Sequence, residues 1–258
     1  MGRTQGDPEV TRQFYDLLVA LEALAGGALS RARELGFRGV GAAVAVSQLM
    51  HAPQRFLDLM VEVRKRGEEE GVDVVTRLVI DVALREGRVK ALLRRWRRKF
   101  EVISAHSVDR RLTAFACRDS RIDVVTMVPG TELMRGDFMY IRTLEKRIEL
   151  LLAPLHEGGL RRRAEVLAEY AALVDLLKRK GLTNRLIFSS GANNLHTLRD
   201  PRSMAALLHV LGLGYEEALN ALSINPASLV KENRDKLAGV VPVRGVRVLG
   251  EDEEVGEE

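Results

Sequence analysis

The stretch LIFSSGA, residues 186–192, decides how the rest of the chain is interpreted. Its three apolar residues are followed at once by Ser189, Ser190 and a glycine. An apolar run that opens onto small polar residues is typical of a buried parallel strand that ends in a functional loop. Asp200 and Pro201 then predict the start of a helix, because aspartate is a good N-cap and proline loses nothing at the first helical position.

Three helices are predicted after this strand: one that stops at Gly212, one over residues 215–222 and one that starts near Pro226. Residues 186–236 carry, in order, Ser-Ser-Gly-Ala, Leu-Arg-Asp-Pro, a leucine-rich helix, Leu-Gly-Leu, Glu-Glu-Ala and Asn-Arg-x-Lys. This order resembles the carboxyl end of the ribonuclease P protein component 3 family. That family supplies an archaeal and eukaryotic protein subunit of the ribonucleoprotein that processes precursor tRNA.

Six more apolar runs predict strands over residues 14–19, 39–46, 72–82, 102–105, 122–128 and 148–153. Helices are predicted between them over 21–35 (where Gly26 and Gly27 can split the helix), 53–70, 88–100, 109–118, 138–146 and 160–180. Strands that are apolar on both faces and alternate with helices form parallel sheets with crossover helices.

Seven such units fit a (β/α) barrel better than an open sheet, although periodicity alone does not separate a barrel from a doubly wound sheet. The resemblance implies an irregular, TIM-like α/β barrel of the polymerase-and-histidinol-phosphatase type. No linker divides residues 1–250, so we expect one barrel domain followed by a disordered acidic tail over 251–258.

The composition indicates a basic protein with a large core. Apolar residues make up 46% of the 258, while aromatic residues make up only 5%, which argues against a base-stacking platform for single strands. Residues 251–258 hold six acids and no base, and the rest of the chain carries 40 basic and 30 acidic residues, a formal charge of +10. A basic body indicates a polyanionic partner.

The cellular setting follows from what the sequence lacks. Cys117 is the single cysteine, which excludes an internal disulfide and fits a reducing cytoplasm. Its apolar neighbours predict that it is a small core residue. No stretch of about eighteen apolar residues predicts a membrane span, and residues 1–9 do not resemble a signal peptide. We therefore expect a cytoplasmic protein with no membrane partner.

A metal centre and a catalytic residue are not predicted. Metal-dependent barrels of the phosphoesterase superfamily carry His-x-His after the first strand, and here Leu18 and Ala20 stand at those positions. The histidines do not show metal-ligand spacing; they are His51, His106, His156, His196 and His209. Phosphate-binding glycine loops and a hydrolase serine elbow are also missing. A metal-dependent phosphoesterase on the same barrel remains the alternative, and a barrel that only scaffolds other proteins is a third hypothesis.

Two basic segments are the main physical features of the sequence. Within residues 88–100, seven of thirteen residues are basic and none is acidic, with an apolar stripe opposite. Like charges at i, i+4 destabilise a helix, and RNA phosphate would offset that cost; a solvated helix face is the alternative. A second cluster, Arg161–Arg163, begins a predicted helix where positive charge opposes the helix dipole.

The resemblance implies the function and the partners, and the basic residues together with the matching motif indicate the site. The chain is expected to bind and stabilise the catalytic RNA of ribonuclease P, which removes the 5′ leader from precursor tRNA with magnesium held by the RNA, and to bind no cofactor itself. A small protein subunit is implied as partner, in a heterodimer that pairs into a heterotetramer, alongside other ribonuclease P proteins. The residues predicted to contact RNA are Arg94, Arg97, Arg98, Arg135, Arg185, Ser189, Ser190 and Arg199. For the two serines, the alternative is a strand-end turn whose hydroxyls bond local backbone.

Overall fold

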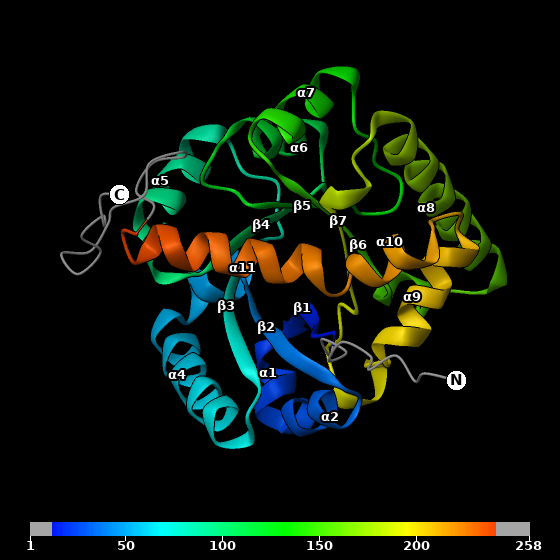
Figure 1. The fold of residues 1–258 in the computed structure, drawn as a ribbon. Helices are drawn as coiled ribbons and strands as arrows, with labels where there is room; N and C mark the ends of the chain where they lie inside the picture. Colours follow the sequence, from blue (N-terminus) through cyan, green and yellow to red (C-terminus); the bar gives the residue numbers. More distant parts are fainter. Residues whose placement is uncertain (1–11, 241–258) are drawn as a thin grey trace, which may run out of the picture.

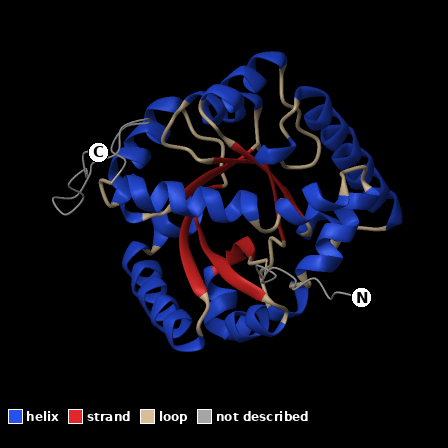
Figure 2. Ribbon diagram, in the orientation of Figure 1, coloured by secondary structure: helices blue, strands red, loops and turns tan. Residues whose placement is uncertain are grey.

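Seven parallel strands form one sheet in which the order in space follows the order in the sequence (Figures 1 and 2). The computed structural model describes residues 12–240, so the acidic segment 251–258 lies outside the described residues. The strands are β1 (Phe14–Ala20), β2 (Phe37–Ala45), β3 (Asp73–Ile80), β4 (Val102–His106), β5 (Val124–Thr126), β6 (Arg147–Leu151) and β7 (Leu186–Ser189). Each predicted strand is therefore present, with ends shifted by a few residues.

The sheet closes on itself where β7 meets β1. Val19 pairs in parallel with Ala192 just beyond the end of β7. Toward the other end of the two strands, the segment 221–222 lies between them and accepts hydrogen bonds from the backbone N–H groups of Phe188 (3.1 Å) and Tyr15 (2.8 Å). The predicted irregular barrel is thus confirmed, and a doubly wound sheet, which would leave two open edges, is excluded.

Helices surround the barrel (Figure 2). They are α1 (Leu21–Ala23), α2 (Leu29–Glu34), α3 (Val46–His51), α4 (Pro53–Glu70), α5 (Glu86–Trp96), α6 (Arg110–Arg118), α7 (Arg135–Thr143), α8 (Leu160–Lys180), α9 (Pro201–Val210), α10 (Tyr215–Asn220) and α11 (Ile224–Leu237). The predicted break at Gly26 and Gly27 is confirmed, since both are non-helical and Gly27 has a φ of 104°, in the region that favours glycine. Within residues 12–240, no helix is both long and apolar enough to cross a membrane.

Three local features differ from the predictions. Helix α3 was not predicted, and β3 ends two residues before the predicted boundary. Asp81, the residue after β3, caps α3: its carboxylate accepts hydrogen bonds from the backbone N–H (3.1 Å) and the hydroxyl of Ser47. The predicted helix over 88–100 also ends early, because α5 stops at Trp96 and Arg97–Lys99 form a separate 3-10 turn.

Helix α11 closes one end of the barrel and crosses in front of the strands in Figure 1. Its buried residues Leu229 and Val230 pack on inward-facing strand residues such as Val75 and Val124. The Asn225 side chain donates to the Leu186 carbonyl at 2.7 Å, at the first residue of β7. The amino-terminal ends of the strands are therefore covered, which leaves the carboxyl-terminal ends, where the strand-to-helix loops lie, as the functional end.

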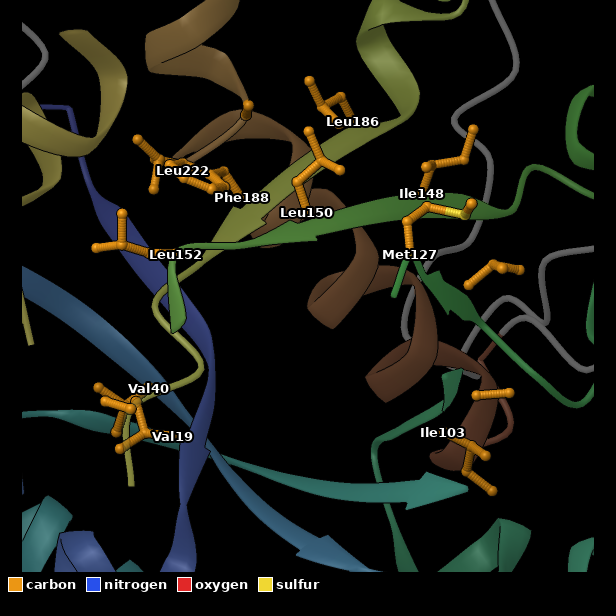
Figure 3. Close-up of a cluster of buried hydrophobic side chains, with 14 of the residues drawn as sticks. Val19, Val40, Ile103, Met127, Ile148, Leu150, Leu152, Leu186, Phe188 and Leu222 are labelled. Atoms are coloured by element: carbon orange, nitrogen blue, oxygen red, sulfur yellow. The ribbon is translucent and has the colours of Figure 1, made fainter. Parts of the chain in front are cut away.

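The main core lies between the strands and the surrounding helices. Figure 3 shows part of it, with Ile148 and Leu150 of β6, Phe188 of β7 and Leu222 from the segment that fills the closure. Cys117 belongs to the same layer and is fully buried, as predicted.

Candidate nucleic-acid interface

The centre of the barrel holds a buried ion pair instead of an open site. Arg77 of β3 and Glu149 of β6 are both fully buried, and two Arg77 nitrogens bind the two Glu149 oxygens, one at 2.8 Å. Arg77 also donates to the Leu17 carbonyl at 2.9 Å, and Ser189 donates to Glu149 at 2.7 Å. Burial acts to raise the pKa of Glu149, but the charge and hydrogen bonds of Arg77 outweigh it and leave that pKa below its ordinary value.

Ser189 and Ser190 are part of this interior. The backbone N–H of Ser190 donates to Asp16 at 3.0 Å, and the Ser190 hydroxyl accepts from the Ala192 N–H at 3.0 Å. Both serines are buried, with exposed fractions of 0% and 1%. The Ser189 hydroxyl binds Glu149 of β6 and the Ser190 hydroxyl binds local backbone, so neither of these hydroxyls, which were predicted to contact RNA, is exposed to a phosphate in this fold.

A second buried carboxyl group lies in the first strand. Burial raises the pKa of Asp16 to about 6, and the Asp16 Oδ2 atom has no hydrogen-bond partner among the described residues. The His106 Nε2 atom on β4 is also without a partner, and burial lowers the pKa of this imidazole. Within residues 12–240, however, no group of three His, Cys, Asp or Glu side chains is placed to hold a metal ion.

An apolar floor separates the ion pair from the open end of the barrel. Leu18, Ala43, Val79 and Leu151, from four different strands, form a small buried cluster beyond the polar layer. The Arg77–Glu149 pair therefore has no contact with solvent and serves the fold, so chemistry or binding has to take place on the rim.

The rim is rich in arginine. We call it the mouth: the strand-to-helix loops and the first helical turns at the carboxyl-terminal ends of the strands. Several exposed arginines there have no ion-pair partner among residues 12–240. They come from α5, α6, α7, α8, the loop before α9 and α9 itself, and are Arg88, Arg111, Arg135, Arg163, Arg199 and Arg202.

These arginines stand where positive charge is least favourable. Helix α8 has no acidic residue in its first turn or at its N-cap, whereas α6 and α9 have none in the first turn but are capped by the carboxylates of Asp109 and Asp200. A cation beside a helix N-terminus interacts unfavourably with the helix dipole, which destabilises the helix by about 0.3–1 kcal/mol. The His156 side chain is close enough to Arg199 and Arg163 to feel their charges. Burial, and then these two charges, lower the pKa of its imidazole. Such an arrangement is relieved by a bound anion.

Arginines near the opposite end of the barrel are mostly neutralised. Arg97 binds Asp123 at 3.3 Å and Arg185 binds Glu145 at 3.0 Å, and the two arginine side chains are only 17% and 18% exposed. Arg234 of α11 binds Asp73 at 2.7 Å. These two predicted RNA contacts, Arg97 and Arg185, are therefore engaged in the fold.

The remaining predicted residues fall into two places. Arg135 and Arg199 lie at the mouth, where Arg199 also donates to the backbone carbonyls of His196 and Leu198. Arg94 and Arg98 are exposed on α5 and on the turn that follows it, away from the mouth.

Sequence reasoning missed two members of the rim. Arg111 and Arg202 each directly follow the first residue of a helix, and neither belongs to a conspicuous basic run. The signal that could have found them is the recurrence of arginine at successive helix starts.

The fold and the mouth define a (β/α) barrel with one cationic end. A model of the family described as RNase P subunit p30 matches residues 13–238, so the chain belongs to that family. The resemblance found in residues 186–236 is confirmed, and the family favours a ribonuclease P subunit over a metal-dependent phosphoesterase.

Curated relatives carry the same family name. Ribonuclease P protein component 3 of Methanothermobacter thermautotrophicus is 24% identical over 231 residues, which cover 86% of this chain and 89% of the relative. The protein of that name from Methanosarcina mazei is 28% identical over 171 residues, or 64% of this chain and 69% of the relative.

Solved structures show the same fold. A chain in a cryo-EM structure of archaeal ribonuclease P with mature tRNA matches with a TM-score of 0.74 and 16% identity, covering 94% of this chain and all of that one. A 5-methylcytosine deaminase from Klebsiella pneumoniae matches with a TM-score of 0.54 and 12% identity over 91% of this chain and 80% of the deaminase. At these identities the likeness concerns the fold alone.

Proposed function

We propose that this chain is an RNA-binding subunit of ribonuclease P that positions and stabilises the catalytic RNA through its cationic mouth. The observation that carries the proposal is the contrast between the two ends of the barrel. Several exposed arginines at the mouth, Arg111 and Arg135 among them, form no ion pair with residues 12–240, whereas Arg97 and Arg234 near the other end are held in ion pairs.

The mouth acts by electrostatics. A guanidinium offers a planar fork of donors that matches phosphate oxygens, and contacts to phosphate fix the position of an RNA without reading its bases. Each neutralised phosphate releases counterions, so binding weakens steeply as salt rises. The chain supplies no reacting group in this proposal: the RNA carries the magnesium ions and the cleavage chemistry, and the protein orients the RNA and reduces its self-repulsion.

The proposal includes the partners that the family resemblance implies. Besides the RNA, the chain pairs with a small ribonuclease P protein subunit in a heterodimer that pairs again into a heterotetramer, within a complex of further proteins. A chain with one buried cysteine suits the reducing cytoplasm.

The test is the salt dependence of binding to ribonuclease P RNA. Replacing Arg111, Arg135 and Arg202 together by alanine removes three mouth charges that make no ion pair with residues 12–240. The slope of log affinity against log salt is expected to become shallower by roughly 2, because each phosphate contact contributes about 0.7–0.9.

A matched control removes the same charge elsewhere. Arg33, Arg64 and Lys65 are exposed basic residues in the carboxyl-terminal halves of α2 and α4, away from the mouth, and they form no ion pair among the described residues. Their triple alanine variant is expected to keep the slope of the wild type, and an equal loss in both variants would overturn the assignment. A third variant, Arg94→Ala with Arg98→Ala, decides whether the outer surface of α5 adds a second RNA contact.

A further inference from the structure

A groove lies between α5 and α6, two helices that follow one another around the barrel (Figure 1). We call it the α5–α6 groove. Its volume is about 350 Å³, which falls within the range of roughly 300–1,000 Å³ for pockets that hold small molecules. Its base is closed by core residues that expose almost no surface, Val89, Leu112 and Phe115. A ligand in the groove would therefore touch mainly the side chains of its two walls.

The walls carry a strong positive charge. The groove is lined by one acidic residue, Glu86, and by four arginines, which are Arg85, Arg110, Arg111 and Arg118. The ammonium group of Lys90 lies beside it, 5.9 Å from the centre of the Phe115 ring. Charge of one sign that is gathered in a cleft attracts ligands of the opposite sign. The lining therefore suits an anion.

Two of the four arginines are held in place by the fold. Arg110 donates to both carboxylate oxygens of Asp137, at 2.6 and 2.9 Å. Arg118 donates to the Ala114 carbonyl at 3.1 Å and to Glu86 at 3.3 Å. Both side chains are nevertheless about half exposed, at 44% and 48%. A guanidinium that is bound along its edge keeps its flat faces free, and such faces stack on unpaired RNA bases.

The α6 wall has a gap between these two arginines. Arg110, Ala114 and Arg118 follow one another at i, i+4 spacing, so they lie on the same face of α6. The two arginines are separated by about 12 Å along the helix axis, at a rise of about 1.5 Å per residue. Only the methyl group of Ala114 lies between them. A flat base fits over this alanine, with a guanidinium on either side.

The other two arginines are available to phosphates. Arg85 and Arg111 are exposed and form no ion pair with residues 12–240. Arg111 also belongs to the mouth, so the groove opens where RNA is proposed to bind. A guanidinium matches the oxygens of a phosphate with its fork of donors. The groove thus offers a place for a base and partners for the phosphates next to it.

The size of the groove decides which form of RNA it can take. A paired RNA helix keeps its bases stacked inside and is far too wide to enter, whereas an unpaired nucleotide can turn its base outward. An acidic protein segment would also satisfy four arginines. Its carboxylates, however, would leave the flat faces of Arg110 and Arg118 without a stacking partner. The lining therefore favours an unpaired nucleotide.

We propose that the α5–α6 groove holds one unpaired nucleotide of an RNA bound at the mouth, with its base over Ala114 and its phosphates at Arg85 and Arg111. The inference rests on the proposed function, which supplies RNA as the ligand. It adds a preference for RNA shape, because phosphate contacts alone do not distinguish a paired strand from a bulge or a loop. The stacking tolerates any base, since every base has a flat face.

Fluorescence anisotropy with the full chain and labelled RNA duplexes tests the proposal. Three duplexes are compared: one fully paired, one with a single unpaired adenosine in the middle, and one with an abasic residue in place of that adenosine. The wild type is expected to bind the adenosine bulge roughly tenfold more tightly than the paired duplex, as the stacking of one base allows. The abasic duplex has the same extra backbone but no base, so it should bind like the paired duplex.

The first variant fills the groove without changing its charge. Ala114→Leu puts a larger side chain where the base is proposed to lie. It is expected to lose the preference for the adenosine bulge but to bind the paired duplex with the affinity and salt dependence of the wild type. Ala168→Leu is the matched control, because Ala168 is an exposed alanine on α8. This control should keep the preference.

A second variant adds no bulk and guards against misfolding. Arg118→Gln removes one guanidinium whose side chain is half exposed, and the preference for the adenosine bulge is expected to fall several-fold. Arg179→Gln is its matched control. Arg179 is likewise an exposed arginine near the end of a helix, α8, and binds the Asp175 carboxylate at 2.9 Å. This variant should bind all three duplexes like the wild type.

The outcomes separate this inference from the proposed function. A preference that survives in both Ala114→Leu and Arg118→Gln overturns the groove assignment. So does tighter binding of oligoglutamate by the wild type than by Ala114→Leu, which would make an acidic protein segment the occupant. Equal binding of the paired and the bulged duplex by the wild type overturns this inference and leaves the proposed function standing. If none of the RNAs binds, the proposed function and the inference both fail.

Discussion

Replacing Arg77 by methionine would remove the positive charge from the centre of the barrel and leave the Glu149 carboxylate without its main partner. Both side chains are fully buried, and Arg77 makes two hydrogen bonds to Glu149 and one each to Ser104, Thr126 and the Leu17 carbonyl. Removing one partner of a buried pair leaves an uncompensated charge and costs about 3–5 kcal/mol. We expect Arg77→Met to lower the free energy of unfolding by that amount.

The same reasoning predicts strong coupling between the two sites. Glu149→Leu alone leaves the guanidinium buried and unpaired, at a similar cost. The double variant removes both charges and should cost no more than either single variant, so the coupling energy should be about 3 kcal/mol. The remaining cost comes from hydroxyl groups such as that of Ser189, which loses its acceptor, at about 1 kcal/mol.

Urea unfolding of the wild type, the two single variants and the double variant measures this cycle, with helix content followed by circular dichroism. Glu149→Gln serves as a milder variant if Arg77→Met does not fold. The view that the pair holds the barrel together would be refuted by either of two results. One is a loss of unfolding free energy below about 1 kcal/mol in each single variant, and the other is a loss in the double variant equal to the sum of the two single losses.

Three further predictions concern buried groups. The pKa of Asp16 is raised to about 6, above its unfolded value, so the folded protein keeps a proton that the unfolded chain releases, and stability should fall as pH rises from about 4 to 6. Asp16→Asn should abolish that loss in urea unfolding at pH 4.5 and 7, and an unchanged pH dependence would contradict the cause given. Burial raises the pKa of Cys117 to about 12, so the native protein should resist alkylation by iodoacetamide at pH 8 and react only when unfolded. Asn233→Ala should lower the unfolding free energy by about 1–3 kcal/mol, because the Asn233 side chain of α11 donates a hydrogen bond to the buried Glu101 carbonyl. A change within experimental error would show that α11 is held by its apolar contacts alone.

The barrel itself was predictable from the sequence because its strands are buried on both faces. Each strand is an apolar run, and Val124–Thr126, the shortest, still stands out between Pro129 and the helix before it. The closure was not predictable, since the segment 221–222 fills the gap between β7 and β1 by backbone hydrogen bonds that leave no pattern in the side chains.

The site was predicted only in outline. Sequence reasoning placed the basic character correctly but could not tell free arginines from paired ones, because the partners of Arg97 and Arg185 lie 26 and 40 residues away in the chain. It also placed Ser189 and Ser190 in a functional loop, whereas both are buried by contacts with β6 and β1. Tertiary contacts decide both distinctions.

Cleavage of the 5′ leader from precursor tRNA tests the central claim most directly. Ribonuclease P reconstituted from its RNA and protein subunits would be compared with and without this chain, at limiting magnesium, where help from protein should matter most. We expect that the chain raises cleavage, that the chain alone does nothing, and that the Arg111, Arg135 and Arg202 triple variant raises cleavage less. Cleavage that is the same with and without the chain would contradict its role as a ribonuclease P subunit.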